Sequence, residues 1–447
     1  MPQTLPKLWN EAERRQVLER LSKNPPYPAR GRVNKVLGPM LEASGLSVEV
    51  GRACHVCLSS GKTVDAEVVG FRDDYTLLMP AGTTRGIAPG NVVQPLAGPP
   101  CIRVSDALLG RVLDACGQPL DGKPLQSGGE LYPLHNSPPN PMNRQLIDEP
   151  MQLGVRLLDA CLSMGWGQRL GLFAAAGVGK STLLGMLARN SDADINVIAL
   201  VGERGRELRE FLERALGPEA MSRCIVVVAT SDMPPLMRVR AALAATTIAE
   251  AFRNRGKRVL LLMDSLTRFL QAQREIGLML GEPPTSKGYT PSCFSMMAEL
   301  IERAGPCEGN GNLSALYTVL VEGDDLTDPV ADAALAVLDG HIVLERRLAE
   351  QGHFPAISLL KSVSRLANTL TPSDVLKTAR SLREELALYE RMEDMVHMGA
   401  YEAGTNPELD RVLRRLPAIK AFMRQEPKQA TTIQQAHDAL LQLMDTP

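Results

Sequence analysis

The pattern of hydrophobic and polar residues changes twice along the chain. Residues 28–98 contain short, apolar, β-branched stretches between Gly and Pro turns, at 31–33, 48–50, 65–70 and 75–79. Strands of this length, separated by frequent turns, are typical of a small β-barrel. We therefore predict a barrel domain over this region.

The two following regions have different periodicities. Residues 99–370 alternate apolar strands with helical stretches. This βαβ pattern predicts an α/β domain with a mainly parallel sheet and helices on both faces. Residues 371–447 show helical periodicity only, and they predict helices over 373–398, 407–425 and 431–444.

An N-terminal arm, residues 1–27, precedes the barrel. Within it, residues 7–23 read as a charged helix with Leu8, Trp9 and Leu18 roughly on one face, and two prolines end the stretch. One interpretation is a helix folded back onto its own chain. The other is an amphipathic arm for a partner or a membrane surface.

Composition limits the class of partner. The 447 residues include 49 Lys and Arg against 51 Asp and Glu, for a net charge of −2, and only 4% are aromatic. Proteins that coat nucleic acid carry a basic stripe, and single-strand binders stack bases on aromatic side chains. We therefore expect no nucleic-acid partner. The eight cysteines lie mostly in apolar runs, which favours reduced thiols in the cytosol.

Metal and membrane signals are weak. Cys54-His55-Val56-Cys57 resembles half of a zinc site, but no second pair of ligands follows at the required spacing. We interpret this stretch as a strand with small buried residues. The N-terminus lacks a signal-peptide pattern, and the longest apolar runs are too short to span a bilayer. We expect a soluble, cytoplasmic chain.

The strongest chemical signal is a phosphate-binding loop within residues 171–182. An apolar strand runs into a loop of small residues and then into a helix. Few Cβ atoms obstruct such a loop, so its backbone N–H groups can point at phosphate oxygens. The residues expected to bind nucleotide here are Ala175, Ala176, Gly177, Val178, Gly179, Lys180, Ser181 and Thr182.

Two residues of this loop have specific roles in such sites. Lys180 would reach the β- and γ-phosphates, and the Ser181 hydroxyl would ligate Mg²⁺. The strict G-x-x-x-x-G-K-S/T pattern fails at its first position, where Ala174 stands. Alanine adopts most loop conformations, so the exception does not exclude the site.

A second apolar strand, 259–263, ends at Asp264, 84 residues after Lys180. A carboxylate at that position is what Mg²⁺ binding beside a phosphate loop requires. Arg268 follows one helical turn later and would face the γ-phosphate. The alternative for Arg268 is a surface salt bridge.

A third strand, 195–201, leads to Glu203. At the carboxyl edge of a parallel sheet, this carboxylate could orient or deprotonate an attacking water. Arg204 could steady phosphate charge or pair with Glu203. With Lys180 and Asp264, Glu203 completes a constellation for hydrolysis of a nucleoside triphosphate.

Four motifs together resemble the bacterial type III secretion ATPases, which in turn resemble the catalytic subunits of rotary ATP synthases. The motifs lie at residues 173–184, 202–207, 263–269 and 340–344. The resemblance implies a RecA-type P-loop NTPase core with an N-terminal β-barrel oligomerisation domain and a C-terminal helical domain. The alanine run 174–176 favours the injectisome branch over the flagellar one.

The resemblance also implies roles for single residues. Glu203 would be the catalytic carboxylate, Arg268 a phosphate contact and Phe354 the aromatic against adenine. Arg365 would be an arginine finger for a neighbouring subunit, neutralising charge in the transition state. The alternatives are a core residue for Phe354 and a helix-start salt bridge for Arg365. Because this chain carries both Glu203 and Arg365, a homohexamer could complete a site at every interface.

By the same resemblance, the protein would be a protein-secreting ATPase that uses ATP and Mg²⁺ at the cytoplasmic face of the inner membrane, where it lies peripherally. Its function would be to couple ATP hydrolysis to chaperone release, unfolding and export of substrate proteins. The implied partners are a stator or regulator protein at the N-terminal arm, a central stalk protein near residues 281–292, an export gate, and chaperone–substrate complexes at the C-terminal domain.

Three alternatives stay open at this point. A rotary-type ATPase subunit would divide the catalytic residues between two chains. A hexameric RNA translocase would need a barrel with exposed aromatic and basic residues, whereas residues 28–98 offer Phe71 and Tyr75 among mixed charges. A non-enzymatic nucleotide-binding subunit would need Glu203 or Lys180 replaced, and both are present.

Overall fold

The computed structural model describes residues 15–16, 30–126, 128–321, 325 and 327–445. These residues fall into two compact units, divided between Pro100 and Cys101. The helix predicted over 7–23 lies outside the described residues, apart from positions 15 and 16.

The first unit contains the predicted barrel, closed by six strands in the order β1-β2-β5-β4-β3-β6. Its inward side chains include Val33, Leu41, Val56 and Leu78, all fully buried. The strands are β1 Gly31–Leu37, β2 Met40–Ser44, β3 Ala53–Cys57, β4 Thr63–Arg72, β5 Tyr75–Pro80 and β6 Val92–Pro95.

Two details of the barrel test the sequence interpretation. The prediction of a strand over residues 48–50 is wrong. These residues lead into a turn at Gly51, whose φ of +83° favours glycine. The side chain of Val50 is exposed there, so its β-branched shape has no core to pack against. The strand interpretation of Cys54 to Cys57 is confirmed by β3, where Cys54 points inward and is buried.

The second unit is built on a mainly parallel sheet with the path β19-β18-β12-β17-β15-β13-β14-β8, and the short β16 also pairs with β17. Along this path every pair is parallel except β18 with β19. The strands are β8 Val112–Asp114, β12 Arg169–Ala174, β13 Ile195–Glu203, β14 Cys224–Thr230, β15 Arg258–Asp264, β16 Gly305–Pro306, β17 Asn312–Leu320, β18 Gly340–Leu344 and β19 Ile357–Ser364. Two small pairs complete the strands: β7 Cys101–Val104 with β9 Glu130–Pro133, and β10 Pro150–Met151 with β11 Met164–Gly165.

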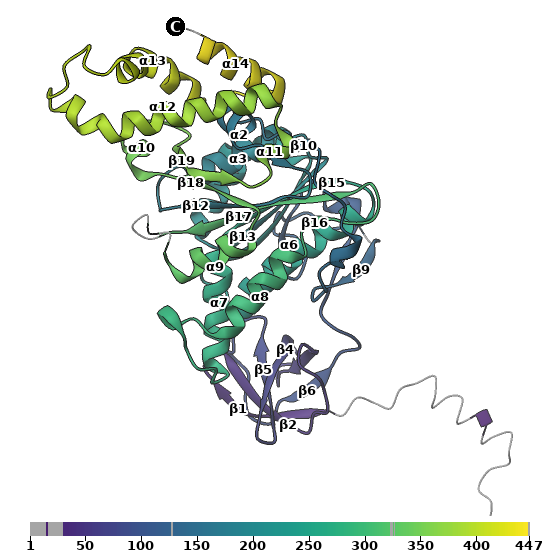
Figure 1. Ribbon diagram of the computed structural model, residues 1–447. Coiled ribbons are helices and arrows are strands. Elements are labelled where there is room, and N and C mark those ends of the chain that lie inside the picture. Colours follow the sequence, from purple (N-terminus) through teal and green to yellow (C-terminus); the bar gives the residue numbers. More distant parts are fainter. Residues whose placement is uncertain (1–14, 17–29, 127, 322–324, 326, 446–447) are drawn as a thin grey trace, which may run out of the picture. The chain divides into compact units, whose positions relative to one another are not determined.

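Helices cover both faces of this sheet, as predicted. Figure 1 shows α2 and α3 on one face and α6, α7 and α8 on the other. The helices are α2 Arg156–Cys161, α3 Lys180–Asn190, α4 Gly205–Glu210, α5 Gly217–Met221, α6 Pro235–Asn254, α7 Leu266–Met279, α8 Pro291–Glu302, α9 Pro329–Val337, α10 Arg346–Glu350 and α11 Ala367–Leu370. Shorter turns are η1 Asp106–Leu108, η2 Pro141–Asn143, the π-helical η3 Phe211–Leu216, and η4 Ser286–Gly288.

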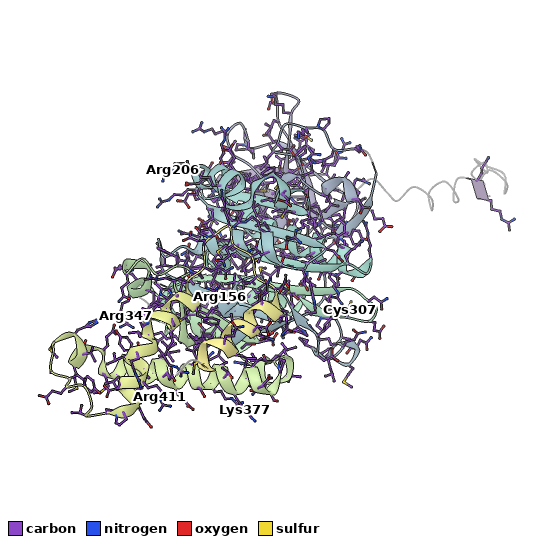
Figure 2. All side chains as sticks on the ribbon, turned by 90° about the horizontal axis from the view of Figure 1, so that it is seen from above. Arg156, Arg206, Cys307, Arg347, Lys377 and Arg411 are labelled. Carbon is purple, nitrogen blue, oxygen red and sulfur yellow. The ribbon has the colours of Figure 1, made fainter. Side chains whose placement is uncertain are left out.

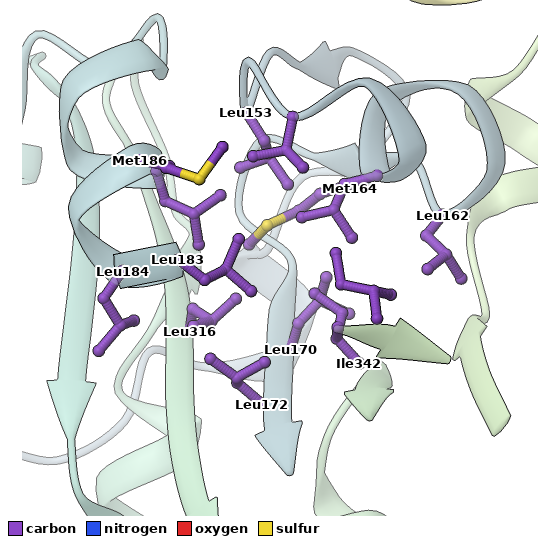
Figure 3. Close-up of a cluster of buried hydrophobic side chains, with 14 of the residues drawn as sticks. Leu153, Leu162, Met164, Leu170, Leu172, Leu183, Leu184, Met186, Leu316 and Ile342 are labelled. Atoms are coloured by element: carbon purple, nitrogen blue, oxygen red, sulfur yellow. The ribbon is translucent and has the colours of Figure 1, made fainter. Parts of the chain in front are cut away.

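Buried apolar side chains from β12, β17, β18 and α3 pack together in one core (Figure 3). Leu170 and Leu172 of β12 lie among Leu316 of β17, Ile342 of β18 and Leu183 of α3, all 1% exposed or less. Because helices cover both faces of these strands, their sequences are continuously apolar and do not alternate between apolar and polar residues. This packing fixes the strand ends that carry the site.

Three C-terminal helices stand close to their predicted limits: α12 Ser373–His397, α13 Pro407–Met423 and α14 Ile433–Asp445. They belong to the same compact unit as the sheet. Arg156, labelled in Figure 2, begins α2 and donates to the carbonyl oxygens of Phe422 at 2.7 Å and Ala421 at 3.0 Å. Each described helix is too short or too polar to cross a lipid bilayer.

Candidate functional site

The candidate site lies at the carboxyl edge of the parallel sheet. Parallel pairing places Asp264, the last residue of β15, opposite Leu200 of β13, so that Glu203 extends three residues further. Ala174, at the end of β12, pairs with Leu320 at the end of β17. The chain leaves β12, β13 and β15 at one edge, where parallel sheets bind ligands.

The phosphate loop is shaped by two glycines. Gly177 and Gly179 have φ angles of +82° and +91°, a backbone region that other residues rarely adopt. Gly179 is the N-cap of α3, so the positive end of the helix dipole faces the loop. Ala174 is still the last residue of β12 and is buried. An alanine fits there because its φ is not positive.

Lys180 links the two predicted carboxylates. Its Nζ forms an ion pair with Asp264 Oδ1 and lies 3.5 Å from Glu203 Oε1. Burial disfavours the ammonium form, but Asp264 and Glu203 outweigh burial and raise the pKa of Lys180. The lysine therefore stays charged and balances two acids in a confined space.

Burial and the charge of Asp264 raise the pKa of Glu203 above its ordinary value, against the opposing effect of Lys180. Asp264 is itself buried and accepts a hydrogen bond from Thr318 Oγ1 at 2.7 Å. Thr318 lies on β17, the neighbouring strand. The surroundings of the two acids therefore differ. Asp264 accepts from Lys180 and Thr318 and is buried, whereas the Glu203 side chain is more exposed.

The two arginines that were predicted beside the phosphates, Arg268 and Arg204, lie in different surroundings. Arg268 lies in the first turn of α7, close to Gly202, where an added Cβ would come 2.9 Å from Arg268 Cβ. Its Nη1 donates to Gln271 Oε1 at 2.9 Å, while its Nε is buried with no partner among the described residues. Arg204 is 77% exposed and pairs with Glu207 at 3.7 Å, rather than with Glu203.

These side chains share one pocket of about 1700 Å³. Its lining includes the loop residues Ala175, Ala176, Gly177, Gly179, Lys180, Ser181 and Thr182, together with Glu203, Arg204 and Arg268. Val178, which belongs to the same loop, is buried. Charged residues of α4, η3 and α5 also line the pocket, as do Pro427 and Lys428.

Phe354 lies beside the phosphate loop although it is 175 positions further along the chain than Gly179. A Cβ added at Gly179 would meet the Phe354 ring at 3.4 Å. Phe354 is 45% exposed, so the alternative of a core residue is wrong. An aromatic ring that is half-open beside a phosphate loop has a free face for a planar group.

Arg365 is the one predicted site residue that stands apart. It follows β19, which runs antiparallel to β18, and Ser364 pairs with Gly340 at the start of β18. Arg365 therefore lies at the amino edge of the parallel strands, opposite the phosphate loop. Its Nη2 donates to the Leu335 carbonyl at 3.1 Å, and no carboxylate of the described residues forms an ion pair with it. The alternative of a helix-start salt bridge is not what the structure has.

Sequence reasoning missed Thr318. The only signal was a hydroxyl within the apolar strand 312–320. Its importance comes from the strand order, which puts β17 beside β15 and so brings Thr318 to Asp264.

The chain matches known proteins along most of its length. Residues 154–364 match the nucleotide-binding domain of the ATP synthase alpha/beta family, 33–97 match the β-barrel domain of that family, and 371–442 match the T3SS EscN ATPase C-terminal domain. The flagellum-specific ATP synthase of Bacillus subtilis is 48% identical over 419 residues, covering 93% of this chain and 95% of that protein.

A type 3 secretion system ATPase of Xanthomonas euvesicatoria is 45% identical, covering 93% of this chain and 94% of that protein. The solved structure of the assembled ATPase EscN, from the type III secretion system of enteropathogenic E. coli, has a TM-score of 0.87 and 40% identity, and it covers 93% of this chain and 100% of that one. The fold is that of these relatives, and the chain belongs to the flagellar and type III secretion ATPases of the ATP synthase alpha/beta family.

Proposed function

We propose that this ATPase works as a homohexameric ring in which each active site is completed by the neighbouring chain. The observation that carries the proposal is the position of Arg365. Lys180, Glu203 and Asp264 meet at the carboxyl edge of the sheet, while Arg365 stands at the opposite edge. An arginine placed there cannot reach the phosphates of its own chain, so it would serve a neighbour.

The phosphate loop and Lys180 would bind the triphosphate of ATP. Lys180 forms ion pairs with Asp264 and Glu203. The phosphates offer the ammonium stronger acceptors, and we infer that Lys180 turns toward them on binding. Phe354 would contact the adenine, since its ring is half-open next to Gly179.

The donor set also fits Mg²⁺. Ser181, in the first turn of α3, offers a hydroxyl, and Asp264 offers a carboxylate, and oxygen ligands of this kind suit that ion. We propose that these two residues hold it. When bound, Mg²⁺ neutralises charge on the β- and γ-phosphates.

Glu203 would orient the attacking water and accept its proton. Its pKa lies above the ordinary value, as expected of a general base tuned toward neutral pH. Arg268, which lines the same pocket and whose Nε has no hydrogen-bond partner among the described residues, would contact the γ-phosphate. Arg204, mostly exposed, would assist from the rim of the pocket.

The solved relatives support an assembly of copies with a central stalk. EscN has been solved assembled and also in complex with its central stalk EscO. We propose that residues 28–98 join the copies, that 99–370 hydrolyse ATP, and that 371–447 bind chaperone–substrate complexes for release, unfolding and export. Residues 1–27 would bind a stator or regulator, a central stalk would contact 281–292, and an export gate would receive the cargo at the inner membrane, with the ring peripheral on its cytoplasmic side.

The main alternative is a rotary-type ATPase subunit coupled to ion transport. That alternative predicts a division of Glu203 and Arg365 between two kinds of chain, and here one chain carries both. An RNA translocase is less supported, because the aromatic Phe71 stands on a barrel of mixed charge.

A pull-down of the intact chain from its cells would test the assignment. Co-purification with a stator, a stalk protein and an export gate is expected. Recovery with proton-pump subunits instead would overturn it. In parallel, phosphate release should require Mg²⁺ and disappear in Lys180→Ala, and RNA should not stimulate it.

A further inference from the structure

We infer that Gln425 is a positioning residue for the base-binding aromatic Phe354, and that it ties the nucleotide site to the C-terminal helices. The inference rests on the proposed function in one respect, namely that Phe354 contacts the base. Gln425 lies just after α13 and is 5% exposed. It lies outside the four sequence motifs.

The first link is direct. The backbone N–H of Gln425 donates to the carbonyl oxygen of Phe354 at 3.1 Å. The Phe354 ring in turn packs on the phosphate loop at Gly179. A displacement of Gln425 would therefore move the backbone of Phe354 and with it the aromatic ring.

The second link fixes Gln425 itself. Its Oε1 accepts from the Arg156 backbone N–H at 2.8 Å, and its Nε2 donates to the carbonyl oxygens of Gly154 at 2.9 Å and Gln429 at 2.8 Å. A buried amide with all of these bonds has little freedom, because breaking one leaves a buried polar group without a partner. The Gln425 side chain thus anchors the loop between α13 and α14 to the start of α2.

The third link reaches the other end of the nucleotide site. Gly154 packs against Asn190, the last residue of α3, so closely that an added Cβ would lie 2.3 Å from Asn190 Cβ. Asn190 Nδ2 donates to the Gln429 carbonyl at 3.3 Å. The loop after α13 therefore contacts both Phe354 and the far end of the helix that begins at Lys180.

The Arg156 side chain adds a further contact between the start of α2 and the end of α13. Its guanidinium donates to carbonyl oxygens at the end of α13 and lies 5.4 Å from the Phe422 ring centre. A shift of Phe354 or of α3 on nucleotide binding would consequently act on α13 through Gln425, Gly154 and Arg156. Among these residues, only Gln425 contacts the Phe354 backbone.

The test compares ATP with inorganic tripolyphosphate, which has the phosphates but lacks the base. In Gln425→Leu, the KM for ATP should rise by roughly three- to tenfold, the loss expected from one well-placed hydrogen-bonded anchor, with kcat changed less than about twofold. Inhibition of the ATPase by tripolyphosphate should keep its wild-type constant, because the phosphate loop is unchanged.

Two further variants sharpen the result. Gln425→Met keeps the length of the side chain but removes its hydrogen-bonding groups, so its KM should rise as in Gln425→Leu; it carries the test if Gln425→Leu does not fold. Gln429→Ala removes an exposed side chain from the same loop and should keep the wild-type KM. Equal weakening for ATP and tripolyphosphate, or an unchanged KM in both Gln425 variants, would overturn the inference. A wild-type chain that neither hydrolyses ATP nor binds tripolyphosphate would instead refute the proposed function.

Discussion

Glu203 and Arg365 lie at opposite ends of the strands of one sheet. Glu203 ends β13 at the carboxyl edge, whereas Arg365 follows β19 at the amino edge, where Ser364 pairs with the first residue of β18. The reversal of β19 relative to β18 produces this separation. Under the proposed function, a single chain would carry both halves of the catalytic site, and a second copy would be needed to unite them.

Glu203→Gln should lower the rate of ATP hydrolysis by roughly 10²- to 10⁴-fold while keeping nucleotide affinity, because the amide cannot accept a proton. Phosphate release and binding of a fluorescent nucleotide measure the two effects. Glu207→Gln is the matched control, since Glu207 pairs with the exposed Arg204. A Glu203→Gln chain with more than about a tenth of the wild-type rate would contradict the role of Glu203.

The pH profile of the wild type should reflect the same residue. A general base must be ionised, and the pKa of Glu203 is raised above 4.5 by burial and by Asp264. Activity should therefore fall as the pH is lowered through a midpoint above 4.5 in kcat/KM. Because Glu207 also raises this pKa, Glu207→Gln should move the midpoint to lower pH. A midpoint that does not move, or moves upward, would argue against Glu203 as the titrating group.

Thr318→Val should raise the Mg²⁺ concentration needed for half-maximal activity by roughly tenfold. The hydroxyl donates to Asp264 Oδ1 at 2.7 Å, and residues that orient a metal ligand have effects of this size. A titration of activity against Mg²⁺ measures it. Thr318→Ser keeps the donor and should behave as the wild type, so an equal change in both variants would exclude the hydrogen bond as the cause.

The buried pair Arg303–Glu250 should matter for stability rather than catalysis. The two side chains are 2% and 3% exposed and lie 2.6 Å apart. Glu250→Ala leaves the guanidinium buried without its counter-ion, which should lower the free energy of unfolding by about 3–5 kcal/mol. Glu213→Ala breaks the exposed Arg209–Glu213 pair, also near 2.7 Å, and should cost less than about 1 kcal/mol. Urea unfolding followed by circular dichroism compares them; similar losses would contradict the account.

The meeting of Lys180, Glu203 and Asp264 at one sheet edge could be predicted from the sequence because local signals coincide there. Continuous apolar strands identify a covered parallel sheet, and the residues just after such strands, Glu203 and Asp264, must meet at its carboxyl edge. The small-residue loop before Lys180 was equally local. These features depend on short stretches of chain and on one rule of sheet architecture.

Features that depend on tertiary neighbours were not predictable in the same way. The direction of β19, the contact of Thr318 with Asp264 and the anchoring of Gln425 to Gly154 all join residues far apart in sequence. The strand expected at 48–50 failed for the opposite reason, since its β-branched residues are suited to a strand but the turn at Gly51 prevents pairing. The ion pair of Arg204 with Glu207 was likewise not predicted, because it forms only when helix α4 brings the two side chains within 3.7 Å.

The most direct test of the account mixes two inactive chains. Glu203→Ala supplies an intact Arg365, and Arg365→Ala supplies an intact Glu203. In a randomly mixed cyclic ring with equal amounts of each, about a quarter of the interfaces should join both wild-type residues, so ATPase activity should recover to about a quarter of the wild-type value. Activity that stays at the level of the single variants would contradict a site shared between neighbouring copies.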